Sequence, residues 1–124
     1  MSKTAIASGN ENQGTDVMYA VDGNKDSRWS SNWDDNAWMY VDLGKIYSIN
    51  RVEIFWEAAY AKEYQIYVSM DGEKWNMIKN LTAQDGEQDT IDFDMVYTRY
   101  VKMQGVKRAT SYGYSIFEFE VYGN

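Results

Sequence analysis

A segment rich in oxygen-bearing side chains, YAVDGNKDSRW at residues 19–29, is the part of the chain that most directly suggests chemistry. Its D-G turn is surrounded by Asp22, Asn24, Asp26 and Ser27. Carboxylate, amide and hydroxyl oxygens at this density suit a hard cation such as calcium. The segment is not an EF-hand loop, because the sixth position is a serine instead of glycine and the twelfth is a tryptophan instead of glutamate. Taken alone, it fits either a calcium site or an Asx turn without metal.

The composition argues against several classes of function. The 124 residues suffice for one domain with its own core. The chain has no cysteine and no histidine, which removes disulfides, the commonest general base and the commonest zinc ligand. A formal net charge of −7 disfavours nucleic acid and anionic membranes as partners, since both require Lys and Arg patches. We find no apolar run long enough for a membrane span or a signal peptide, and we expect Met1–Lys3 to be an added start.

Short runs that alternate between apolar and polar residues predict an all-β fold, an antiparallel β-sandwich with about eight strands. The clearest run places Tyr64, Ile66 and Val68 on one face of a strand. Turn signals such as Asp71-Gly72 and Asp85-Gly86 separate the runs. The expected strands are Thr4–Ser8, Ala37–Leu43, Ser48–Trp56, Glu63–Ser69, Trp75–Lys79, Thr90–Phe93, Thr98–Gln104 and Ser115–Tyr122.

Three loops between these strands are rich in aromatic and polar residues: Ser31–Trp38, Trp56–Glu63 and Lys107–Ser115. The loops of a sandwich gather at its two ends, so segments far apart in sequence can form one site. Several of these loops can therefore converge into one site.

The chain resembles the discoidin-like superfamily, also called the coagulation-factor C-type domain, and more narrowly the bacterial family 32 carbohydrate-binding modules. The resemblance covers nearly the whole chain in the family's order. It is carried by AVDGNKDSRWSS at 20–31, WMYVDLG at 38–44, INRVEIFW at 49–56, YQIYVSMDGEKW at 64–75, TRYVKM at 98–103 and YGYSIFEFEVYG at 112–123. It implies an eight-stranded antiparallel jelly roll of the discoidin, galactose-binding-like type and a single module over residues 1–124.

The resemblance also implies a structural calcium ion (Ca²⁺) that joins the N-terminal D-G turn to a glutamate on the last strand. Its ligands in this chain would be the carbonyl of Tyr19, Asp22, Asn24, Ser27, the carbonyl of Phe117 and the carboxylate of Glu118. If Glu118 faces inward among core residues it needs a partner, because burying an unpaired carboxylate is unfavourable. The alternative is that Glu118 lies on the solvent face beside Glu120.

Sugar recognition requires an aromatic ring that stacks on the sugar and polar side chains that bind hydroxyl groups. In the family this site lies in the loops at one end of the sandwich. The candidate stacking rings are Trp33, Tyr112 and Tyr60, and the candidate polar residues are Glu11, Arg28, Glu57 and Arg108. We expect a β-glucan-type polysaccharide including chitosan first, then mannan, and then galactosides. Galactosides rank last because galactose-binding members of the family often use a histidine that this chain lacks.

Structural roles compete with these assignments. Arg28 and Arg108 can pair with Asp34, Asp35 or Glu57 as exposed ion pairs of small energetic weight. Packing in the core or against loops is the favoured role for Trp29, Trp38, Trp56 and Tyr114.

The favoured function is a non-catalytic, monomeric carbohydrate-binding module that targets an appended secreted bacterial glycoside hydrolase to polysaccharide. A glycosidase would need two carboxylates flanking a bond. Asp34, Asp35, Glu57 and Glu63 are available, but they lie in small loops of a module-sized domain. The other alternative is a lipid- or protein-binding adhesion domain of the discoidin type, which the negative charge and the lack of cysteine disfavour.

Overall fold

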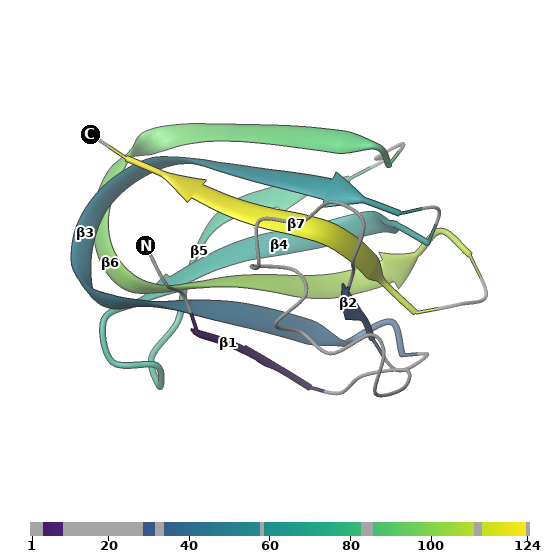
Figure 1. Cartoon of the computed structure of the whole chain (residues 1–124), viewed down its shortest axis with the longest axis horizontal. Helices are drawn as coiled ribbons and strands as arrows, with labels where there is room; N and C mark the ends of the chain where they lie inside the picture. Colours follow the sequence, from purple (N-terminus) through teal and green to yellow (C-terminus); the bar gives the residue numbers. More distant parts are fainter. Residues whose placement is uncertain are drawn as a thin grey trace.

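The computed structural model describes residues 4–8, 29–31, 34–57, 59–82, 86–110 and 113–123, which form an all-β fold (Figure 1). The strands are β1 (Thr4–Ala7), β2 (Trp29–Ser30), β3 (Trp38–Trp56), β4 (Ala61–Ser69), β5 (Asn76–Leu81), β6 (Gln88–Arg108) and β7 (Ser115–Tyr122). All of their pairings are antiparallel, which confirms the predicted fold class. None of the described residues is helical, so no helix in this part of the chain could cross a membrane.

Two long, bent strands build both layers of the sandwich. The hydrogen-bonded order is β2-β7-β3-β6-β4-β5, with β1 added to β3. The first half of β3 pairs with the second half of β6, and after the bend its second half pairs with the first half of β6 and with β7. Figure 1 shows β3 and β6 curving together from one layer into the other. Four of the eight expected strands are therefore halves of β3 and β6, and the two-residue strand β2 was not predicted.

The core lies between the layers and follows the predicted alternation. On β4, Tyr64, Ile66 and Val68 are buried while Gln65 and Tyr67 are partly exposed. The core also contains Trp29, Met39, Val41, Val52, Ile54, Trp56, Tyr114, Ile116 and Phe119. Trp29, Trp56 and Tyr114 are thus structural, as the sequence analysis favoured. Each fully buried large side chain contributes about 1.5–3 kcal/mol of transfer free energy.

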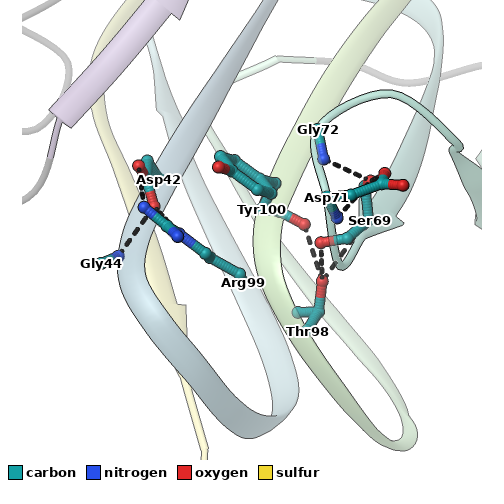
Figure 2. Close-up of polar contacts among 8 residues, drawn as sticks. All are labelled: Asp42, Gly44, Ser69, Asp71, Gly72, Thr98, Arg99 and Tyr100. Carbon is teal, nitrogen blue, oxygen red and sulfur yellow. Dashed lines mark hydrogen bonds and ion pairs between the residues drawn. The ribbon is translucent and has the colours of Figure 1, made fainter.

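Polar contacts fix the bend of the two long strands at the end of the sandwich shown in Figure 2. The Asp42 carboxylate accepts hydrogen bonds from Arg99 Nε at 2.8 Å and Nη2 at 3.1 Å, and from the Gly44 N–H at 2.8 Å. The hydrogen bond from Arg99 is the main reason that the pKa of Asp42 lies below its usual value. The Thr98 hydroxyl lies 2.9 Å from the Ser69 carbonyl and accepts the Ser69 N–H at 3.1 Å.

The outer face of one layer carries a cluster of aromatic rings, and Trp38 belongs to it. Trp38 and Tyr40 point away from the core, with ring centroids 5.7 Å apart and planes 13° apart. The Lys102 ammonium lies 4.4 Å from the ring centroid of Trp75 and 5.2 Å from that of Tyr67. Trp38 is half-buried and lies outside the core cluster, so of its two expected roles, packing in the core or against loops, the core role is wrong. Successive side chains of β3 point to opposite faces, so the ring of Trp38 points outward where its neighbour Met39 points into the core.

Candidate functional site

The predicted loops converge at one end of the sandwich. The Ser31 N–H donates to the Tyr114 carbonyl at 2.7 Å, and the Glu57 N–H donates to the Ser115 carbonyl at 2.9 Å. The Ala109 N–H donates to a carbonyl of the second loop at 3.2 Å. Figure 1 shows this end on the right, where β3 and β6 end and β7 begins. Main-chain hydrogen bonds therefore join residues that are between 49 and 83 positions apart in sequence, which confirms that the predicted loops converge.

A fourth loop reaches the same end. The Trp56 N–H donates to the Glu87 carbonyl at 2.7 Å, immediately before the start of β6. Gly86 lies directly against the ring of Tyr60, since a Cβ at this position would stand 2.8 Å from Tyr60 Cδ1. The sequence predicts a turn at Asp85-Gly86, but no sequence pattern places that turn at the site.

Tyr60 and Glu57 are the two predicted sugar-binding residues of the second loop. Tyr60 is partly buried, packs against the core, and its carbonyl accepts the Ala109 N–H. Glu57 is also partly buried, and its Oε1 atom accepts the Ala59 N–H at 3.4 Å. An aromatic ring and a carboxylate thus lie close in sequence on a loop whose main chain is bonded to the loops on both sides.

Arg108 forms the ion pair that was left open as an alternative to ligand binding. Its Nε donates to Asp35 Oδ1 at 2.8 Å, and its backbone N–H donates to the same atom at 3.0 Å. These hydrogen bonds hold the pKa of Asp35 below its usual value. The Tyr114 hydroxyl donates to the Asp35 carbonyl at 2.6 Å. The first and third loops are therefore joined through side chains, and the Asp35 side chain is half exposed at this junction.

A buried polar network fixes the start of the second loop. The Asp89 carboxylate, in a residue only 8% exposed, accepts hydrogen bonds from Trp56 Nε1 at 2.9 Å and from the Tyr64 hydroxyl at 2.6 Å. The rings of Trp56 and Tyr64 meet edge to face, with centroids 5.4 Å apart. Burial, followed by the contact with Asp89, raises the pKa of the Tyr64 hydroxyl far above its usual value. The network fixes Trp56, the residue that precedes Glu57, and no sequence motif pointed to Asp89.

Four of the predicted sugar-binding residues lie outside the described residues: Glu11, Arg28, Trp33 and Tyr112. Their assignment to the sugar site therefore stays a prediction.

The calcium prediction also depends on residues outside the described part of the chain: Tyr19, Asp22, Asn24 and Ser27. Of the two ligands expected on β7, Phe117 is partly buried and Glu118 is only 3% exposed. The alternative that Glu118 lies on the solvent face is therefore wrong, and an inward carboxylate fits a ligand of a hard cation. Among the described residues, no three acidic side chains are grouped closely enough to hold a metal.

Comparisons with known proteins agree with this architecture. Residues 19–103 match the model of a family described as a NedA-like, galactose-binding domain. Chitosan-binding module 1 from a chitosanase/glucanase of Paenibacillus sp. IK-5 is 44% identical, with a TM-score of 0.94 over 98% of this chain and 95% of that chain. Module 2 of the same enzyme, solved in complex with chitotriose, is 40% identical, with a TM-score of 0.95 over 98% of this chain and 96% of that chain.

Two further comparisons concern a separately solved module and a much longer protein. The module CpGH89CBM32-5 from Clostridium perfringens has a TM-score of 0.88 over 98% of this chain and 95% of that chain, and its 20% identity shows the fold alone. The polysaccharide lyase 8 family protein HylA of Enterococcus faecalis is 36% identical over 111 residues. That match spans 83% of this chain but only 8% of HylA, so the chain corresponds to a small part of that protein.

Proposed function

Because the chain belongs to the F5/F8 type C family of galactose-binding-like, discoidin-like domains, we propose that it is a non-catalytic carbohydrate-binding module with chitosan as its ligand. The observation that carries the proposal is the nearly end-to-end similarity, at 40–44% identity, to two chitosan-binding modules. Other β-glucan-type polysaccharides follow chitosan as candidates, and mannan comes after them.

The chemistry of the loop end supports an amino-sugar ligand. A chitosan unit presents an ammonium group and an apolar ring face, which call for a carboxylate and an aromatic ring. Glu57 and Tyr60 supply these groups at the converging loops, and the net charge of −7 attracts a polycation over longer distances. In this proposal Trp33 and Tyr112 stack on the sugar, while Glu11, Arg28 and Arg108 select the geometry of its polar groups.

The role of such a module would be to hold an appended catalytic domain on its polysaccharide. Support comes from the origin of the similar modules in a chitosanase/glucanase and from the match to one small part of HylA. The full-length protein would then be an extracellular bacterial enzyme.

The stacking rings provide the direct test. We expect Trp33→Ala and Tyr112→Ala each to weaken binding of chitotriose about ten- to hundredfold, measured by isothermal titration calorimetry, because a stacking ring contributes about 1–3 kcal/mol. Tyr97→Ala is the matched control, since Tyr97 is 64% exposed on the other end of the sandwich. If both loop variants keep full affinity for a ligand that the native chain binds, the site lies elsewhere on the surface.

The structural calcium ion is part of the same proposal. A chelator should lower the melting temperature by several degrees, because a cation that binds only the folded state stabilises it by about 2.7 kcal/mol at one hundred times its Kd. Added calcium should restore the native value. Asp22→Ala should have the low melting temperature without chelator and gain nothing from calcium. Identical melting curves with and without chelator would refute the calcium site.

A further inference from the structure

Glu87 has a backbone conformation that does not suit its residue type. Its φ angle is +63°, and it is the only residue other than glycine with a positive φ among those that the structure describes. Residues with a Cβ atom adopt this left-handed region at an energetic cost, and glycine is the residue that fits it best. The preceding residue, Gly86, is also left-handed, with a φ of +82°. The turn therefore bears a strain that a second glycine would remove.

Two contacts join the strained turn to the second loop, Trp56–Glu63. The Glu87 carbonyl accepts the Trp56 N–H at 2.7 Å, and buried Gly86 packs under the ring of Tyr60. Since Glu57 follows Trp56 directly, the main chain of Glu87 lies beside both predicted sugar-binding residues of this loop. The side chain of Glu87 is exposed.

Within the described part of the chain, the Glu87 carboxylate takes part in no hydrogen bond or ion pair. Strained residues gather at binding sites, and an observed outlier is a reason to look for function there. Within the described part of the chain, this carboxylate is exposed and sits at a position that favours glycine, which makes it a candidate for contact with a ligand.

We infer that Glu87 is a ligand-contacting residue that pairs with an ammonium group of the amino-sugar polymer, on a fourth loop of the site. The inference rests on the proposed function, because only a deacetylated amino sugar offers this cation. It adds a second carboxylate beside Glu57 and predicts a preference for deacetylated over acetylated units.

Two substitutions at position 87 separate binding from stability. Glu87→Gln removes the charge and keeps the shape, and we expect it to weaken binding of chitotriose about two- to fivefold at low salt, the effect of an exposed ion pair. The difference should shrink at high salt and vanish with fully N-acetylated chitotriose. Glu87→Gly should weaken chitotriose binding equally while raising the melting temperature, because glycine relieves the left-handed strain. Glu73→Gln, in the exposed turn at the other end of the sandwich, is the charge-matched control.

The outcomes distinguish the inference from the proposed function. Native affinity for chitotriose in Glu87→Gln, with a native chain that does bind it, overturns the role of Glu87 and leaves the proposed function standing. An equal loss in Glu73→Gln also overturns it, because the effect is then one of net charge. A native chain that does not bind chitotriose at all refutes both.

Discussion

Removal of the Asp89 carboxylate should test how the end of the sandwich with the converging loops is supported. Asp89 is the shared acceptor for Trp56 Nε1 and the Tyr64 hydroxyl, and all three side chains are buried. In Asp89→Ala both donors remain inside the protein without this acceptor. An unpaired buried donor costs about 1–3 kcal/mol, so the two together predict a loss of about 2–6 kcal/mol in the free energy of unfolding. That is a large share of the roughly 5–15 kcal/mol that stabilises a typical domain.

Tyr64→Phe perturbs the same network more gently. It removes one donor to a charged acceptor, worth about 1.5–3 kcal/mol, and leaves the hydrogen bond from Trp56 in place. In the Asp89→Ala background the phenol hydroxyl no longer has its acceptor, so its removal should cost nearly nothing. The double-mutant cycle should therefore give a coupling free energy of at least about 1 kcal/mol.

Urea unfolding of the native chain, the two single variants and the double variant at pH 7 provides the four free energies. The slopes of the unfolding curves should agree, so that midpoint differences report stability. Additivity of the two single substitutions to within about 0.5 kcal/mol would refute the network, because independent sites behave in that way. An Asp89→Ala variant as stable as the native chain would refute it as well.

Three further expectations concern other parts of the fold. Gly105→Ala should lower stability by about 1–3 kcal/mol in urea unfolding, because its Cβ would stand 2.2 Å from the Tyr114 ring; a stability gain would contradict this packing. The hydrogen bond from Arg99 lowers the pKa of Asp42. The ionised carboxylate therefore stabilises the folded state fully at pH values above its usual pKa of 3.8, and this stabilisation is lost as the pH falls through the lowered pKa. Melting temperatures between pH 5 and 2 should consequently fall less in Asp42→Asn than in the native chain, and equal falls would contradict the pairing. Trp38→Ala should lower the free energy of unfolding by clearly less than the roughly 3–5 kcal/mol expected for a fully buried tryptophan such as Trp29. Equal losses of stability in Trp38→Ala and Trp29→Ala, measured by thermal unfolding, would place both rings in the core.

Local periodicity was enough to predict the buried faces of the strands. The alternation on β4 gave the inward residues Tyr64, Ile66 and Val68 correctly. It failed at the bend of β3, where Gly44, Lys45 and Ile46 are all exposed while the strand stays hydrogen-bonded. A break in the pattern of burial therefore looked like the end of a strand. The short β2 was missed because it exists only through its pairing with β7, which a local pattern cannot reveal.

The components of the candidate site were predictable to different degrees. Composition identified the three loops, since aromatic and polar residues were concentrated there. The sequence alone could not show whether Arg108 pairs with Asp35, because the two residues are 73 positions apart and only the fold brings them together. Asp89 and Glu87 lie in the polar run EQDT, which resembles an exposed turn. Their roles depend on Trp56, more than thirty residues earlier, and so became visible only in three dimensions.

The way in which the loops are attached allows the proposed ligand contacts to be tested one at a time. The hydrogen bonds from Trp56 to Glu87 and from Glu57 to Ser115 involve only main-chain atoms. Replacing the side chain of Glu57 or Glu87 with glutamine leaves these bonds intact, so the loops keep their positions while the charge presented to a ligand changes. Arg108 differs, because its side chain itself joins two loops through Asp35. A loss of affinity in an Arg108 variant would combine a lost contact with a displaced loop, whereas a loss in the two glutamate variants would report the contact itself.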